Sequence, residues 1–272
     1  MKTRILTGIL LGLFFVPVFV IGGWVLQVVL GLLSVYAGYE ILGMIKQGNF
    51  LPMRVFIYGL FMNALFYSFL LYGLLNGDLG VFLLAMLLVL ILSGSILMVA
   101  IDEMKFDLFA NVTMSVLYPV LGFASLYYVR DVGLAYLGLL FVITISTDVF
   151  AYFVGISIGK HRLAPKISPK KSIEGSLGGL LFAAIFSVIY VLILRQGETS
   201  ISIDLWLVAL VAVLVSIMAQ VGDLVASKMK RTYDVKDFSN VFPGHGGVMD
   251  RFDSSMFAAM LFVLIVSLGL IG

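Results

Sequence analysis

The sequence predicts an all-α integral membrane protein, a polytopic bundle of about nine transmembrane helices. Two observations predict this fold class. Of the 272 residues, 62% are hydrophobic and 12% are charged, whereas about 25% are charged in ordinary soluble domains. The hydrophobic residues also form continuous runs long enough to span a bilayer as helices, and their continuity excludes the alternating pattern of a β-barrel. The runs cover residues 5–22, 24–43, 55–75, 80–100, 108–128, 132–155, 177–195, 204–226 and 254–271.

The first run follows a basic N-terminus, as the apolar part of a signal peptide does, but no small-residue cleavage site precedes Trp24. We therefore expect it to be retained as the first span. Within it, Gly8 and Gly12 have the GxxxG spacing that suits close packing of helices in lipid. We predict helices for packing, dimer or lipid contacts over residues 1–100, and a catalytic transmembrane region over 101–272 with cytoplasmic loops 156–176 and 227–253.

Basic residues lie almost entirely on one side of this predicted bundle. If the N-terminus is cytoplasmic and the spans alternate, the opposite side carries only Arg130 and Arg195. An excess of Lys and Arg marks cytoplasmic loops, so we predict N-in/C-out topology in the cell inner (cytoplasmic) membrane, with the active site facing the cytoplasm. The basic residues then assigned to the cytoplasm are Lys2, Arg4, Lys46, Arg54, Lys105, Lys160, Arg162, Lys166, Lys170, Lys171, Lys228, Lys230, Arg231, Lys236 and Arg251.

The chain contains no cysteine and only two histidines. This composition excludes disulfides and thiolate chemistry, and it disfavours a histidine-rich zinc site. A bound metal is therefore expected to be a hard cation on carboxylates, with Mg²⁺ the first candidate and a second cation left open.

Two carboxylates lie within apolar runs. For Glu40, near the cytoplasmic end of the second run, we favour a hydrogen bond to a neighbouring helix over a functional role. Asp148 shares one helical face with Tyr152, Gly155 and Gly159, and the two glycines could simply form a packing seam. Because a carboxylate inside a span costs about 2.5–3.5 kcal/mol on insertion scales, we favour a functional role for Asp148 over a structural salt bridge.

A basic loop follows the sixth run, and its two prolines prevent a continuous helix. Lys160, Arg162 and Lys166 suit anchoring at anionic lipid headgroups. The stretch Ser168-Pro-Lys-Lys-Ser-Ile-Glu-Gly175 combines a rigid turn, two lysines and a flexible end. It could bring those lysines and backbone N–H groups beside phosphate oxygens.

The longest polar interval in the chain runs from Gln220 to Asp253. It begins on a helix, where an amide, a carboxylate, a hydroxyl and a cation recur on one face as the helix leaves the membrane. Such a stripe predicts a polar cavity. These residues are Gln220, Asp223, Ser227 and Lys230.

Beyond this helix, the segment Phe242-Pro-Gly-His-Gly-Gly247 contains glycines that allow positive φ and close approach of backbone to a ligand. Asp250 and Asp253 follow at the start of the last run. We expect one of the pair to be the N-cap, and the helix dipole gives Asp253 a structural explanation. Asp250, with Arg251 beside it, has no such explanation.

We expect Asp148, Asp223 and Asp250 to converge at the cytoplasmic membrane boundary. Carboxylates that close repel one another, and a divalent cation would stabilise them. The many cations nearby then imply a polyphosphate ligand bridged by Mg²⁺. The chain lacks the GxxxxGK[ST] loop of P-loop nucleotide sites, which disfavours that class.

The polar interval resembles a known family. Ser227-x-x-Lys-Arg-x4-Lys-Asp-x-Ser-x2-Phe-Pro-x-His-Gly-Gly-x-x-Asp-Arg-x-Asp253 matches, at every defined position, the signature of the phosphatidate cytidylyltransferases, or CDP-diacylglycerol synthases. Asp148-x3-Tyr152-x2-Gly155-x3-Gly159 and Ser168-Pro-Lys-Lys-x-x-Glu-Gly175 also look like that family. The resemblance covers roughly residues 144–256, and it departs at Ser172 and Ile173, where Thr and an aromatic residue are commoner.

The resemblance implies Mg²⁺-dependent transfer of the cytidylyl group of CTP to phosphatidic acid, giving CDP-diacylglycerol and pyrophosphate. It also implies contact with membrane lipids and a homodimer, and nothing indicates nucleic acid as a partner. The catalytic candidates are Asp148, Asp223, Asp250, Lys171 and His245, and the metal-ligand candidates are Asp223, Asp250, Asp148 and Asp253. The substrate-binding candidates are Lys170, Ser227, Lys230, Arg231, Lys236, Asp237, Gly246, Gly247 and Arg251.

Other functions remain as alternatives. A CTP-dependent polyprenol or phytol kinase also needs Mg²⁺ and a basic loop, whereas the spacing typical of CDP-alcohol phosphotransferases is absent. An ion-coupled transporter could use Asp148 and Asp223 as an ion path, but it would be expected to show internal repeats and broken helices. No repeat is apparent, and the charges gather at one face.

Overall fold

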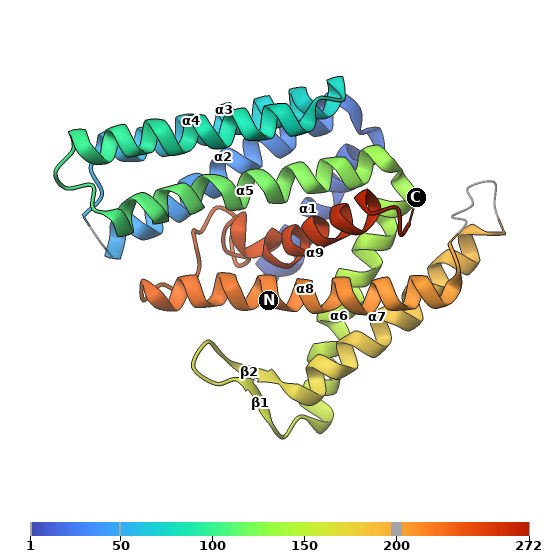
Figure 1. Ribbon diagram of the computed structural model, residues 1–272. Coiled ribbons are helices and arrows are strands. Elements are labelled where there is room, and N and C mark those ends of the chain that lie inside the picture. Colours follow the sequence, from blue (N-terminus) through green and yellow to red (C-terminus); the bar gives the residue numbers. More distant parts are fainter. Residues whose placement is uncertain (1, 49, 197–202, 272) are drawn as a thin grey trace. The chain divides into compact units, whose positions relative to one another are not determined.

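The computed structural model describes residues 2–48, 50–196 and 203–271, and the side chains from residue 6 onward. Over these ranges it contains nine α-helices and one short two-stranded hairpin (Figure 1). Each helix overlaps one of the nine predicted apolar runs, which confirms the predicted helical class. The helices are α1 (Lys2–Ile21), α2 (Gly23–Gly48), α3 (Met53–Asn76), α4 (Leu79–Ala100), α5 (Phe106–Val132), α6 (Leu134–Ile158), α7 (Ile173–Leu194), α8 (Leu205–Thr232) and α9 (Met249–Ser267).

Within the described ranges, the seven helices α2 to α8 are long and apolar enough to cross a membrane. The apolar part of α1, Leu6–Ile21, is shorter. Helix α9 has Asp250, Arg251 and Asp253 among its first residues, so its apolar part begins only after them. The nine expected spans are therefore seven long apolar helices and two at the ends of the chain with shorter apolar stretches.

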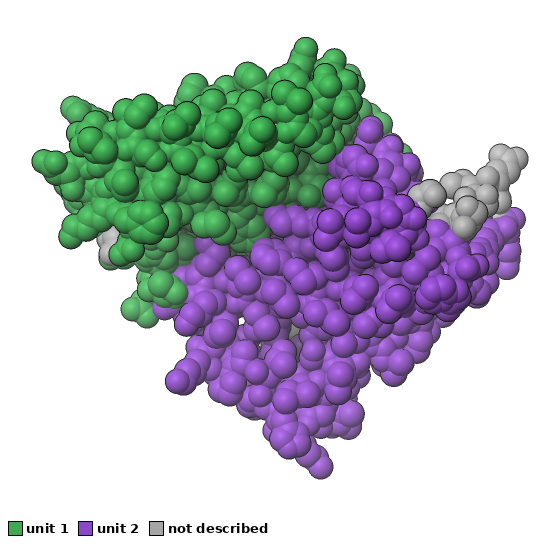
Figure 2. All heavy atoms as spheres, viewed as in Figure 1, with its two compact units in different colours: residues 1–127, 232–251 green, residues 128–231, 252–272 purple. Residues whose placement is uncertain are grey.

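The chain divides by its contacts into two compact units (Figure 2). Unit 1 comprises residues 1–127 and 232–251, and unit 2 comprises residues 128–231 and 252–272. This division concerns packing. The predicted division of roles at residue 100 stays a prediction.

In unit 1, helices α1 to α4 pack in sequence order, each against the next (Figure 1). Buried and half-buried polar groups join these mostly apolar helices. The Ser34 hydroxyl of α2 donates to Asn63 Oδ1 of α3 at 3.0 Å. The Tyr58 hydroxyl of α3 lies 2.8 Å from Ser93 Oγ of α4. Hydrogen bonds of this kind hold helices together where lipid supplies little hydrophobic driving force.

In unit 2, helices α6 and α7 pack along a seam of small residues. A Cβ atom on Gly175 would lie 2.5 Å from the Ala151 carbonyl oxygen and 3.0 Å from Gly155 Cα, and one on Gly179 would lie 2.8 Å from the Thr147 carbonyl oxygen. The backbones can therefore approach this closely only because the side chains are absent. The packing-seam interpretation of Gly155 is confirmed.

The basic loop between α6 and α7 forms a hairpin of β1 (Arg162–Ala164) and β2 (Ser168–Ser172), which an all-α prediction did not include. The strands are antiparallel, with Arg162 opposite Ser172 and Ala164 opposite Ser168. Pro169 is tolerated because each strand of a two-stranded sheet has one edge that needs no ladder hydrogen bonds. The prolines exclude a helix, as predicted, and the chain pairs with itself instead.

Candidate active site

Asp223 lies on α8 and forms an ion pair with Lys171 of β2, both in unit 2. The Ser227 hydroxyl, one helical turn further along α8, donates to Asp223 Oδ1 at 3.3 Å. The side chains of Asp223 and Lys171 are 31% and 28% exposed, so solvent or a ligand can reach both. Here the predicted polar stripe on α8 meets the predicted phosphate-binding lysine.

Asp253, on α9 before the apolar run, is the most buried carboxylate of unit 2, with 8% of its surface exposed. Burial and the nearby carboxylates of Asp223 and Asp148 raise the pKa of Asp253 from 3.8 to about 7, against opposing effects of the Ser254 N–H and Lys230. The Ser254 N–H donates to Asp253 Oδ1 at 2.7 Å. Asp223 and Asp148, two other predicted metal ligands, therefore both lie within electrostatic reach of Asp253 in unit 2.

The chemistry of this carboxylate set suits a hard divalent cation, because its donors are oxygen atoms whose mutual repulsion a cation would relieve. Among the described residues, however, no three His, Asp or Glu side chains are grouped closely enough to hold a metal ion. The donor types fit Mg²⁺, and the role of each residue as a ligand stays a prediction.

Hydrogen bonds at the start of α7 hold the hairpin that carries Lys171. Ser172 is the N-cap of α7 and accepts a hydrogen bond from the Gly175 N–H at 3.2 Å. Glu174 accepts hydrogen bonds from the N–H groups of Lys160 and His161, and its Oε1 lies 2.6 Å from His161 Nδ1. Glu174 thus ties the entry of the hairpin to its exit.

A second contact joins this region to α8. The Ser176 hydroxyl donates to Gln220 Oε1 at 2.6 Å, one turn before Asp223. Gln220 therefore orients α7 against α8 and has a structural role within the polar stripe.

In unit 1, Glu40 of α2 is bound to the segment that precedes and begins α9. Its carboxylate accepts hydrogen bonds from Ser239 Oγ at 2.5 Å, Val248 N at 2.9 Å and Met249 N at 2.8 Å, and the residue is 2% exposed. The prediction that Glu40 is hydrogen-bonded is confirmed. Its partners, however, belong to the motif from Ser227 to Asp253, which is expected to carry the chemistry. The spacing of residues in the sequence does not indicate this contact with Glu40.

Asp250 is also held by backbone groups in unit 1. Its Oδ2 accepts hydrogen bonds from Phe238 N and Gly247 N, both at 2.9 Å. Helix α9 begins at Met249, so neither Asp250 nor Asp253 is its N-cap, and that prediction is wrong. The view that Asp250 lacks a structural explanation is also wrong, because a carboxylate with two backbone donors stabilises the turn before the helix.

Gly246 and Gly247 make room for these carboxylates. Gly246 has a φ of +82°, and a Cβ atom there would lie 2.7 Å from Asp250 Oδ2. A Cβ atom on Gly247 would collide with the Glu40 carboxylate. The close approach expected at these glycines therefore occurs with side chains of the protein itself.

The turn that contains His245 packs against α1. The Thr7 hydroxyl donates to the Pro243 carbonyl oxygen at 3.1 Å, and a Cβ atom on Gly8 would lie 3.7 Å from His245 Nε2. His245 Nδ1 is buried and has no hydrogen-bond partner among the described residues. The sequence indicates only packing, dimer or lipid contacts for α1, yet this helix supports the turn.

The remaining predicted substrate-binding residues lie at partly or fully exposed positions. Lys230 is partly exposed near the end of α8, where it acts electrostatically on Asp253. Lys170, Arg231, Lys236, Asp237 and Arg251 are exposed.

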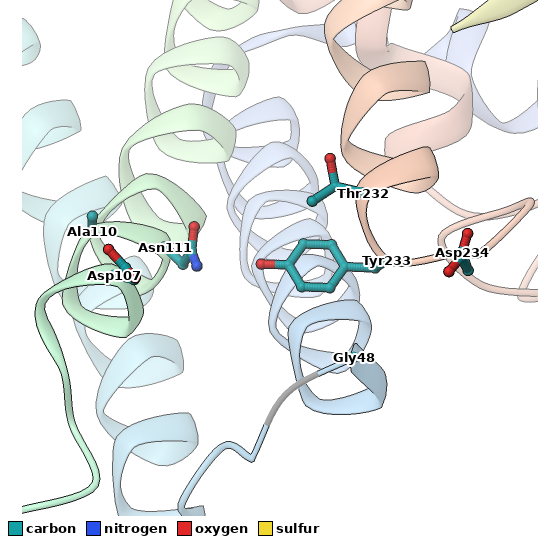
Figure 3. Close-up of a pocket in the computed structure, with 7 residues that line it drawn as sticks. All are labelled: Gly48, Asp107, Ala110, Asn111, Thr232, Tyr233 and Asp234. Carbon is teal, nitrogen blue, oxygen red and sulfur yellow. The ribbon is translucent and has the colours of Figure 1, made fainter. Parts of the chain in front are cut away.

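Unit 1 also contains a pocket of about 550 Å³ that none of the predicted site residues lines. It lies between the end of α2, the first turns of α5 and the residues after Arg231 (Figure 3). Tyr233 packs against Gly48, where any Cβ atom would meet its ring, and its hydroxyl points toward Asn111 (Figure 3). The lining residues are Gly48, Asp107, Ala110, Asn111, Thr232, Tyr233 and Asp234.

Comparison with known proteins places these residues in a family context. The model of the cytidylyltransferase family matches residues 2–268. A phosphatidate cytidylyltransferase of Staphylococcus epidermidis is 35% identical over 266 residues, covering 96% of this chain and 97% of its own. The Bacillus subtilis protein of the same name is 34% identical over 275 residues, covering 98% of each chain. That of Staphylococcus aureus is 33% identical over 268 residues, covering 96% and 97%.

Proposed function

The chain belongs to the cytidylyltransferase family, and from this premise we propose that it transfers the cytidylyl group of CTP to phosphatidic acid, forming CDP-diacylglycerol and pyrophosphate. The observation that carries the proposal is the similarity to proteins named phosphatidate cytidylyltransferase over 96–98% of the chain. The paired carboxylates and lysines of unit 2 are a suitable setting for this reaction.

In the proposed reaction, a phosphate oxygen of phosphatidic acid attacks the α-phosphorus of CTP. A new P–O–P bond forms, the bond from the α-phosphorus to the bridging oxygen of the β-phosphate breaks, and pyrophosphate leaves with that electron pair. Because the second pKa of a phosphate monoester is about 6, the nucleophile is already ionised at neutral pH. The reaction therefore needs no general base, which agrees with a set of carboxylates and lysines around Asp223.

What the reaction does need is alignment of two anionic substrates and neutralisation of their charge. Lys171 and Lys230 stand beside the carboxylates in unit 2 and would hold phosphate oxygens. Four exposed cations would assist by binding the triphosphate and the lipid headgroup. These cations are Lys170, Arg231, Lys236 and Arg251.

Asp223, Asp253 and Asp148 would hold the Mg²⁺ ion that we propose as cofactor, and Asp250 remains a further proposed ligand. A bound Mg²⁺ would supply positive charge to the phosphate oxygens and leaving group. Lys171 forms an ion pair with Asp223, one of these proposed ligands.

Membrane insertion rests on the seven long apolar helices. We further propose that the site faces the cytoplasm in the cytoplasmic membrane, where the positive-inside distribution directs the basic loops. The substrates and partners are then CTP, phosphatidic acid and membrane lipids, and a homodimer is proposed from the family resemblance.

The test is formation of CDP-diacylglycerol from α-labelled CTP by purified protein in detergent. Asp223→Asn and Asp253→Asn are expected to lower turnover by about a hundredfold or more, because the proposed Mg²⁺, which would neutralise charge at the phosphates, is held less well. Asp131→Asn, an exposed carboxylate of the same unit, is the matched control and should retain activity. Chelation with EDTA should abolish turnover, and added Mg²⁺ should restore it.

Near-normal turnover by both Asn variants across a Mg²⁺ titration would contradict the metal assignment. Appearance of label in the lipid from γ-labelled CTP, and not from α-labelled CTP, would instead indicate a kinase.

A further inference from the structure

Two buried carboxylates, Glu40 and Asp250, hold both ends of the segment Phe238–Met249, which includes the turn at residues 242–247. We propose that Glu40 is a positioning residue for this segment, which it fixes from α2 in the conformation that cytidylyl transfer requires. This inference rests on the proposed function and extends it to a residue outside the motif.

The Glu40 carboxylate reaches both ends of the segment at once. Ser239 Oγ donates to Glu40 Oε1 at one end, while Val248 N donates to Oε1 and Met249 N to Oε2 at the other. These two N–H groups are at the start of α9, where backbone donors lack partners within the helix and favour a negative charge. One side chain thereby closes the segment and caps the helix that carries Asp250 and Asp253.

Asp250 adds a second tie between the same two ends. Its Oδ2 joins Phe238 N to Gly247 N. Between these ties the chain turns through a short bridge, in which Phe242 N donates to the Gly246 carbonyl oxygen at 2.9 Å. The segment is thus closed by two carboxylates and one backbone bridge.

The cost of this arrangement points to function. Glu40 and Asp250 lie close enough to repel one another, and both are buried. Burying two carboxylates side by side costs free energy, and neutral groups could have tied the loop without that cost. A buried ionisable group in an apolar helix normally marks function. Here the groups that it orders include His245 and Asp250, two of the predicted catalytic residues.

The experiment uses full-length protein with a single cysteine at Asn240, an exposed position inside the segment, because the chain has no cysteine of its own. Glu40→Gln keeps the size of the side chain but replaces one acceptor by an NH₂ group that would face backbone donors. Ser34→Ala is the matched control, since it removes a buried hydrogen bond of the same helix at 3.0 Å that does not involve the segment.

We expect Glu40→Gln to lower kcat at least tenfold while KM for CTP changes less than threefold, and to raise the rate of thiol labelling at position 240 at least threefold. Ser34→Ala should leave kcat and labelling unchanged even where it lowers the melting temperature. If Glu40→Gln does not fold, Ser239→Ala, which removes one of the three hydrogen bonds, should still raise the rate of labelling, by less than the increase expected for Glu40→Gln.

Unchanged kcat and labelling in Glu40→Gln would overturn the proposal. So would a loss of activity that follows melting temperature equally in Glu40→Gln and Ser34→Ala, because that result means a purely structural role. If the unsubstituted protein makes no CDP-diacylglycerol while labelling still depends on Glu40, the proposed function fails and the structural tie stands.

Discussion

Lys170 and Lys171 are neighbours in the sequence and differ in their surroundings. Lys171 forms an ion pair with Asp223, whereas Lys170 is exposed on the hairpin. Successive side chains of a strand point to opposite faces, so only one of the two can face α8. The register of β2 thus decides which lysine meets the carboxylates.

The two lysines should therefore differ in their contribution to catalysis. Lys171→Met is expected to reduce kcat/KM by about 10²–10³, the usual effect of losing a preorganised charge at a reacting phosphate. Lys170→Met should reduce it by about tenfold or less, mainly through long-range attraction of CTP that added salt screens. Initial rates at two ionic strengths measure both effects, and equal losses in the two variants would contradict the assignment.

At the scale of elements, the glycines of α7 and the hydrogen bonds at its start decide where the hairpin lies. The seam with α6 brings the two backbones together, while Ser172 and Glu174 hold the strand that enters α7. A change at the seam should therefore affect both stability and the position of Lys171.

Gly175→Ala tests this seam. The added Cβ atom would lie 2.5 Å from the Ala151 carbonyl oxygen, so the helices must separate, at a cost of about 1–3 kcal/mol. Gly43→Ala in α2 is the control, because no heavy atom lies within 4 Å of its added Cβ atom. Because alanine loses less backbone entropy on folding than glycine, that variant should be more stable by about 0.5–1 kcal/mol. Thermal unfolding in one detergent compares them, and equal midpoints would refute the seam as a constraint.

At the scale of the whole molecule, the orientation in the membrane is predicted from where the charges lie in the chain. The basic hairpin and the segment after α8 fall on one side if spans alternate, and Arg130 and Arg195 fall on the other. The positive-inside rule then predicts that the site faces the cytoplasm.

Single cysteines test this orientation. Asn240→Cys should react with an impermeant thiol reagent only when the cytoplasmic face is open, and Gln196→Cys, between α7 and α8, should react in intact cells. Both positions are exposed. Labelling of position 240 from outside would reverse the predicted topology.

The sequence alone predicted the helical membrane class, because apolar runs are local and their length can be compared directly with a bilayer. It also predicted the family, since the motif from Ser227 to Asp253 is contiguous. The hairpin was missed, because two short strands have no periodicity to distinguish them from a loop.

Only the tertiary structure decided what the individual carboxylates contact. Asp250 and Asp253 are three residues apart in the same motif. Asp250 accepts hydrogen bonds from backbone N–H groups, whereas Asp253 lies near Asp223 and Asp148. Glu40 is separated from its partners by about two hundred residues, for instance 199 from Ser239. Such contacts depend on which helices pack together, and spacing along a chain carries no record of packing between distant segments.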